Sequence, residues 1–252
     1  MKKKLLFATT AEDAPQAARR FGLGIELSDF GYAPNMDPPQ FDEKGPAARE
    51  KLRAAERHVF HAPFGEMSPA SVDPLVLEVV YRRLGQGAEL ARTLGIRRMV
   101  VHSGYIPRVY FKVWQHDRSV EFWKRFMAGQ PEDFCIMVEN VMDDTPEMIP
   151  DIVRDVNDPR VGICLDVGHV NVTSRVPIRE WIDAAAPYLT HVHLHNNDGI
   201  TDLHDHPARG TLDIPWIMDY VNRLCPAATM TFEVMHAMET GQWLEENGFL
   251  ND

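Results

Sequence analysis

Long apolar runs are missing from this 252-residue sequence, and none approaches the roughly 18 residues that a helix needs to cross a bilayer. The N-terminus opens with basic residues, MKKK, but the apolar stretch that follows, LLFA, is too short for a secretory signal peptide. We therefore expect no membrane segment and no cleaved leader.

Cysteine is also scarce. The three cysteines, Cys135, Cys164 and Cys225, are far apart and form no CxxC pair, and two of them lie in apolar runs that indicate buried strands. An odd number of widely spaced cysteines argues against a disulfide scaffold. The sequence therefore predicts reduced, inert thiols in a cytoplasmic protein.

Basic residues are outnumbered, because 26 lysines and arginines face 37 aspartates and glutamates, for a formal net charge of −11. Such a charge repels polyanions, so it argues against nucleic acid and anionic membranes as partners, although a local basic patch would escape this argument. Hydrophobic residues make up 44% and charged residues 25% of the chain, which is typical of a soluble globular protein and excludes a disordered or collagen-like one.

What the chain contains is an alternation of two kinds of segment. Short apolar runs typical of buried strands are separated by longer amphipathic stretches typical of helices. The expected strands are Lys4–Thr9, Gly24–Phe30, His58–Phe64, Arg98–Ser103, Cys135–Asn140, Val161–Val167, His191–Asn196 and Thr229–Met235. The clearest helix, Pro74–Leu94, has Asp73 as its expected N-cap and Gly95 just beyond its end.

Eight strands, each followed by a helix, in about 250 residues predict one α/β domain, residues 1–252, folded as a closed (β/α)8 TIM barrel. An open doubly wound sheet would alternate in the same way. The length, the count of eight and the polar residues at the strand ends favour the barrel. Two stretches, the proline-rich Pro34–Pro46 and Tyr105–Gln115, are expected to be loops within this domain.

Imidazoles and carboxylates recur where the expected strands end. They are His61, His102, Glu139, Asp166, the triplet His191, His193 and His195, and Glu233, while His169, Asp202 and His204 follow in the next loops. In a barrel these ends converge on the face that carries active sites. A ring of such groups would be mutually repulsive or badly desolvated without a cation. Mixed histidine and carboxylate ligands suit Zn²⁺, Mn²⁺, Fe²⁺ or Co²⁺ better than Ca²⁺.

Each of these residues has a simpler interpretation on its own. A lone buried histidine such as His61 or His102 is more often satisfied by a hydrogen bond than by a metal, and Asp166 would serve to cap the turn after its strand. The three alternating histidines of HVHLHNND point to one side of their strand. We expect one ligand among them and contacts to ligands or substrate from the others. Six strands that each end in a ligand-type residue nevertheless favour a metal centre.

Seven short motifs occur in order along the chain. They are HAPF, VVHSG, VEN, LDVGH, HVHLHNND, DLH and FEV. Each is weak alone, but the ordered series, from Gly22 to Val234, resembles the xylose isomerase-like TIM barrels. This family includes sugar isomerases and epimerases and the endonuclease IV type of DNA repair enzyme.

The resemblance implies different ligand sets in the two branches. In the endonuclease IV branch, three zinc ions would be held by the positions matching His61, His102, Glu139, Asp166, His169, His193, Asp202, His204 and Glu233. In the ketose epimerase branch, one metal would be held by the positions matching Glu139, Asp166, His193 and Glu233. There the two glutamates also move the proton, and the residue matching His169 contacts the substrate.

Several positions depart from the DNA repair branch. Its first strand usually carries Gly-Ala-His where this chain has KLLFATT, and its Gly-Glu-Gly segment is Ala208-Arg209-Gly210 here. No basic, aromatic-rich loop is present that would wedge into a duplex. The family often has a lysine in the region that His195 occupies, and no lysine follows Lys124, which excludes a Schiff-base aldolase with a late-strand lysine.

The sequence leaves three functions open. The favoured one is isomerisation or epimerisation of a small sugar, sugar acid or polyol through an enediolate-like state, with one to three zinc or manganese ions. Glu139 and Glu233 would move the proton, His169 would assist them at the substrate, and His195 and Arg209 would contact it. Phosphodiester hydrolysis at a multinuclear zinc site is second, opposed by the acidic charge. A non-catalytic metal- or sugar-binding protein is third. A homodimer is an open possibility for the assembly.

Overall fold

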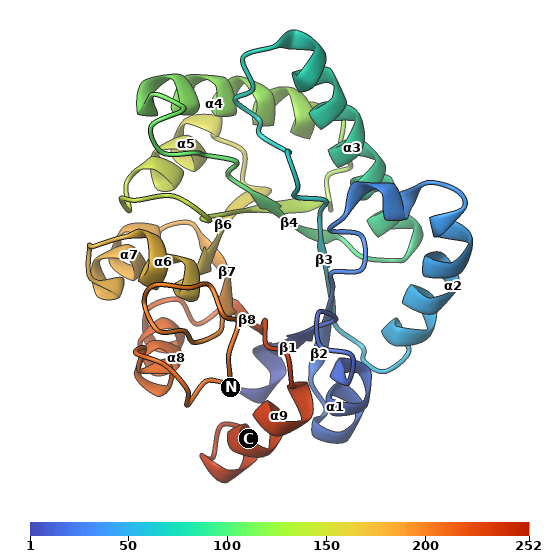
Figure 1. Ribbon diagram of the computed structural model, residues 1–252, viewed down its shortest axis with the longest axis vertical. Coiled ribbons are helices and arrows are strands. Elements are labelled where there is room, and N and C mark those ends of the chain that lie inside the picture. The colour runs from blue at the N-terminus through green and yellow to red at the C-terminus, as the bar shows by residue number, and fades with distance from the viewer. Residues whose placement is uncertain (252) are drawn as a thin grey trace.

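The computed structural model describes residues 1–251 and shows a closed barrel of eight parallel strands in the order β1 to β8 (Figure 1). The strands are β1 Leu5–Ala8, β2 Gly24–Leu27, β3 His58–His61, β4 Arg98–His102, β5 Cys135–Glu139, β6 Val161–Asp166, β7 Leu189–Leu194 and β8 Thr229–Phe232. Pairing of β1 with β8 closes the ring. The predicted (β/α)8 barrel is therefore confirmed.

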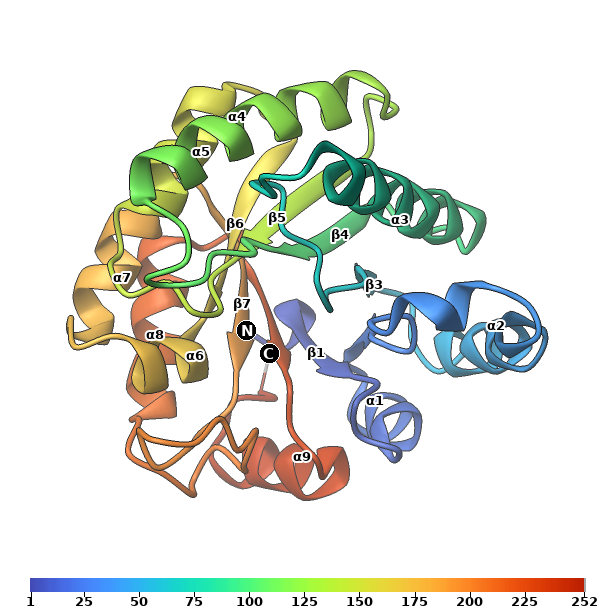
Figure 2. The same cartoon turned by 45° about the horizontal axis from the view of Figure 1, so that its top comes forward.

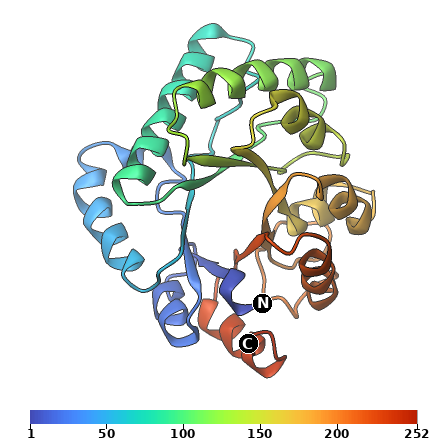
Figure 3. The ribbon, with the colours of Figure 1, turned by 180° about the vertical axis from the view of Figure 1, so that it is seen from behind.

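Helices surround this barrel on all sides (Figures 2 and 3). Within the described residues they are α1 Ala14–Phe21, α2 Gln40–Leu52, α3 Pro74–Thr93, α4 Lys112–Ala128, α5 Met148–Val156, α6 Val167–Thr173, α7 Ile178–Ala185, α8 Ile214–Leu224 and α9 Ala237–Glu246. Short 3-10 turns cover Lys2–Lys4 and Ala33–Met36. None of the helices in residues 1–251 is long and apolar enough to span a membrane.

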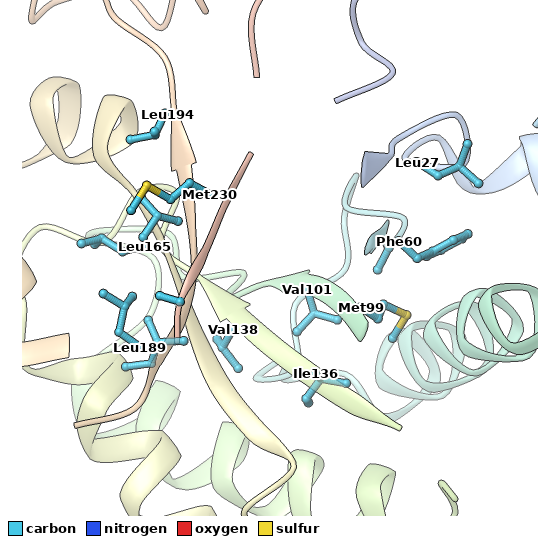
Figure 4. Packing of buried hydrophobic residues seen from close by; sticks show 14 of the residues in the cluster. Leu27, Phe60, Met99, Val101, Ile136, Val138, Leu165, Leu189, Leu194 and Met230 are labelled. Atoms are coloured by element: carbon cyan, nitrogen blue, oxygen red, sulfur yellow. The ribbon is translucent and has the colours of Figure 1, made fainter. Parts of the chain in front are cut away.

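Two layers of apolar side chains hold the barrel together. Outward-facing strand residues such as Phe60, Val101 and Ile136 belong to the large core between strands and helices (Figure 4). A smaller cluster of buried residues comprises Leu6, Val59, Val100, Met137 and Cys164. Because side chains alternate along a strand, residues that point into the barrel are two positions apart, and the next inward positions toward the strand ends carry the polar groups.

Two expected loops are partly helical. The Pro34–Pro46 stretch contains the 3-10 turn and the start of α2, in which Pro46 lies inside the helix. A proline removes one helical hydrogen bond, but Ala48 and Leu52 are buried against the barrel, so packing sustains the helix. The Tyr105–Gln115 stretch is also shorter than expected as a loop, because α4 begins at Lys112.

Candidate metal centre

The carboxyl ends of the strands bring the candidate ligands into register. His102 of β4 pairs with Glu139 of β5, and Asp166 of β6 pairs with His193 of β7. Strand pairing thus places an imidazole beside a carboxylate twice on the same face of the barrel. This is the face on which barrel enzymes carry their active sites.

A central group of four residues shares a volume small enough for one ion. Ligand atoms of Glu139, Asp166, His193 and Glu233 all lie within 4.8 Å of one another. His193 Nδ1 lies 3.2 Å from Glu139 Oε1, 3.8 Å from Asp166 Oδ2 and 3.6 Å from Glu233 Oε2. All four side chains are buried. The arrangement is a three-carboxylate, one-imidazole donor set.

A second group shares Glu139 with the first. Its Oε2 lies 3.3 Å from His61 Nε2 and 3.4 Å from His102 Nε2. The ring of Phe64 stacks on His102 at a centroid distance of 4.9 Å and restricts the orientation of that imidazole. Glu139 therefore stands between two groups of donors and has one oxygen directed to each.

A third group lies on the other side of Asp166. It comprises His169, His195, Asp202 and His204, whose ligand atoms also lie within 4.8 Å of one another. Asp202 Oδ2 is 3.3 Å from His169 Nε2 and 3.2 Å from His204 Nε2. The rings of His195 and His204 stack at 3.9 Å. His204 has a φ of 47°, a left-handed conformation that is uncommon for a histidine and typical of functional sites.

The electrostatic environment of the three donor groups, which together form a ring at the mouth of the barrel, strongly favours positive charge. Burial lowers the pKa of His61, His169 and His204, but neighbouring carboxylates outweigh it and raise the pKa values to about 9, 10 and 9. Burial dominates at His102, where it lowers the pKa to about 3, and at the deeper His191, where it lowers the pKa to about 4. The carboxylates therefore draw protons onto the imidazoles, and a divalent cation would neutralise the same charge.

Two buried carboxylate oxygens among these donor groups point to a bound cation. Glu139 Oε2 and Asp166 Oδ2 are both buried and make no hydrogen bond among the described residues, although imidazole nitrogens lie 3.3 Å and 3.6 Å away. The other oxygen of Asp166, Oδ1, accepts from the His169 backbone N–H at 2.7 Å and caps α6. A buried carboxylate oxygen without a partner is costly, and a metal ion would satisfy both. The donor set therefore fits a Zn²⁺- or Mn²⁺-type ion.

Ten of the eleven predicted site residues lie in these three groups. The exception is Arg209, which ion-pairs with Glu239 and lies 3.7 Å from Asp205. It makes no hydrogen bond or ion pair with a ring residue, so its predicted contact with substrate has no geometric support beyond its place in the loop after β7.

Sequence reasoning missed Glu26 of β2. This carboxylate is fully buried and accepts a hydrogen bond from His193 Nε2 at 3.0 Å. The available signal was a glutamate inside the short apolar run GIEL, because charged residues are rarely buried without a partner. His191, one of the three histidines for which the sequence predicts a ligand or a contact to a ligand or substrate, lies deeper in the barrel and contacts the same carboxylate at 3.0 Å.

Comparisons with known proteins agree with this architecture. An uncharacterized protein of Methanocaldococcus jannaschii, MJ1311, is 28% identical over 180 residues, which are 66% of this chain and 60% of that protein. The TTHB071 protein from Thermus thermophilus, solved after soaking with ZnCl2, is 27% identical with a TM-score of 0.74, and 98% of each chain is covered. A D-tagatose 3-epimerase-like protein has a TM-score of 0.78 at 20% identity, again with 98% of each chain covered, which shows a shared fold.

Sugar epimerases recur among the other solved structures with this fold, including one of D-psicose and one of a 3-keto-D-glucoside. The sequence itself matches the family described as xylose isomerase-like TIM barrel over residues 15–251. With that match covering nearly the whole sequence, the chain belongs to the xylose isomerase-like TIM barrel family.

Proposed function

We propose that the chain is a metal-dependent isomerase or epimerase of a small sugar, sugar acid or polyol. The observation that carries the proposal is the central group, in which Glu139 at the end of β5 and Glu233 directly after β8 approach the same imidazole, His193. Proton removal and return at a carbon next to a carbonyl needs two such groups near one carbon atom. The sugar epimerases that share the fold support the substrate class.

The four residues of the central group would together hold the ion, and its two glutamates would also move the proton. A bound divalent ion would supply Lewis-acid stabilisation of negative charge on the substrate oxygens. Glu139 and Glu233 would act as base and acid at the two faces of the reacting carbon, since they reach the site from different strands. His169, whose pKa is raised, would donate from its imidazole to a substrate oxygen. We retain as part of the proposal substrate contacts from His195, which is buried in the third group, and from Arg209 in the loop after β7.

Solvent exchange tests this proposal without knowledge of the product. Ketoses, sugar acids and polyols are incubated in D2O with the zinc- or manganese-loaded protein, and loss of a carbon-bound proton is followed by NMR. At least one substrate should exchange, and E139Q and E233Q should each slow exchange by about 100-fold or more. The proposal would be refuted if exchange persisted in both variants, or if none of the ketoses, sugar acids and polyols exchanged a proton.

Phosphoester hydrolysis is the second candidate, because two further donor groups flank the central one and Glu139 is shared between two of the three. Such adjacent sites are the arrangement that multinuclear phosphoesterases use. Hydrolysis of bis-p-nitrophenyl phosphate and of abasic duplex DNA would test it. If this candidate is right, H102A and H204A abolish hydrolysis, whereas under the first proposal they spare proton exchange.

A further inference from the structure

A chain of buried polar residues runs through the barrel beneath the candidate metal centre. Glu26 lies at its middle and accepts three hydrogen bonds. Its Oε1 receives one from His193 Nε2 at 3.0 Å, and its Oε2 receives two, from His191 Nε2 at 3.0 Å and Thr231 Oγ1 at 2.6 Å. All four side chains are buried, so no bulk water competes for these bonds.

Arg98, at the far end of this series of hydrogen-bonded side chains, sets the direction of the hydrogen bonds. Its guanidinium can only donate, and Nη1 donates to Thr229 Oγ1 at 2.9 Å. The single hydroxyl proton of Thr229 then goes to His191 Nδ1, 2.5 Å away, since its other acceptor, the Thr190 carbonyl, lies at 3.5 Å. His191 therefore keeps its own proton on Nε2, where it is shared between Glu26 Oε2 at 3.0 Å and Thr231 Oγ1 at 2.9 Å.

This order of donors leaves Glu26 as an acceptor for His193. We propose that Glu26 is a positioning residue that holds the proton of His193 on Nε2 and turns Nδ1 toward Glu139, Asp166 and Glu233. A histidine that ligates a metal through one nitrogen usually donates its other N–H to such a partner, which sets the ring orientation. The inference rests on the metal centre of the proposed function but not on the reaction carried out there.

Glu26→Gln provides the test, with Thr231→Val as the matched control. Glutamine keeps the size of the side chain but replaces one acceptor oxygen with an NH2 group, so it cannot accept from donors on both sides. Thr231→Val removes the hydroxyl that donates to Oε2 and that also lies 2.9 Å from His191 Nε2, but it leaves the contact between Oε1 and His193 in place. The two variants therefore separate loss of the His193 contact from general disturbance of the buried chain.

Two measurements on the zinc-loaded protein give the result. The ring nitrogen shifts of His193 in 15N NMR should place zinc on Nδ1 and a slowly exchanging proton on Nε2. Chelator competition should show that E26Q weakens zinc binding by about 10- to 100-fold, whereas T231V changes it by less than about threefold. Zinc on Nε2 of the wild type, or wild-type zinc affinity in E26Q, would overturn the proposal. The wild-type spectrum decides the matter even if E26Q does not fold.

The outcomes also separate this inference from the proposed function. Tight zinc binding with the expected His193 spectrum but no proton exchange on any sugar supports the positioning role and refutes the isomerase. Proton exchange on a sugar together with zinc bound to Nε2 of His193 supports the isomerase and refutes the positioning role of Glu26.

Discussion

Replacement of Asp143 by asparagine should make the protein more stable relative to the wild type at neutral pH than at acidic pH. Asp143 is fully buried in the loop after β5, where its Oδ2 accepts from Ser103 Oγ at 2.7 Å and from the Val141 backbone N–H at 3.1 Å, while Oδ1 has no partner. Burial raises the pKa of Asp143 to about 6, more than these hydrogen bonds lower it. The folded protein therefore binds this proton more tightly than the unfolded chain does.

The sign and the size of the effect follow from that shift. A raised carboxyl pKa means that the stability contribution is complete below pH ~4 and is lost as the pH rises through about 6. The full loss is about 3 kcal/mol, since one pKa unit corresponds to about 1.4 kcal/mol. Asparagine does not titrate, so the stability of D143N relative to the wild type should increase by about 2–3 kcal/mol between pH 4 and pH 7.5. The cost of burying an unpaired amide in D143N does not depend on pH, so it would lower the unfolding free energy of the variant equally at both pH values.

Urea unfolding followed by circular dichroism at the two pH values measures this change. All samples contain a chelator, so that titration of the metal ligands affects every variant alike. D219N, at an exposed position of α8, is the control and should show the same relative stability at both pH values. A stability difference between D143N and the wild type that does not change with pH would refute the reasoning.

Three further predictions follow from the site. G168A should destabilise the protein by about 1–3 kcal/mol, because a Cβ at Gly168 would lie 2.0 Å from His195 Cε1. G85A is its control: Gly85 lies within α3 with no atom within 4 Å of an added Cβ, and alanine there should add about 0.5–1 kcal/mol in thermal or urea unfolding. D166N should lose tightly bound zinc in equilibrium dialysis, since Asp166 belongs to the central group and its buried Oδ2 makes no hydrogen bond; retention of zinc would contradict the ligand assignment. H102A should lower the zinc stoichiometry only if the second group holds an ion, and an unchanged value would exclude an ion in that group.

The strands were the most predictable part of the fold. A run such as MVVH or CIMVE is apolar, short and bounded by polar residues, so its place in a buried parallel sheet follows from composition alone. Ligand-type residues at the ends of these runs could be assigned to one face because all eight strands are parallel. Helix boundaries were less predictable: α2 continues through Pro46 and α4 starts at Lys112 because tertiary packing overrides local preference.

Side-chain relations across the barrel could not be predicted from sequence. Glu26 and His193 are 167 positions apart, and their contact depends on barrel closure rather than on any local pattern. The short helix α6 was likewise not expected, although Asp166 caps it with one oxygen and directs the other into the ring. The interpretation of Asp166 as a cap and its interpretation as a ligand are therefore compatible.

Metal content is the most direct test of the central claim that the ring of carboxylates and histidines is a metal centre. Protein purified without added metal or chelator should contain at least one equivalent of zinc or manganese per chain by elemental analysis, and D166N should contain less than about a tenth of that. A value near one would place the ion in the central group, and a value of two or three would extend it to the flanking groups and favour phosphoester hydrolysis. Wild-type protein that holds no metal, even after equilibration with zinc and manganese, would contradict the account.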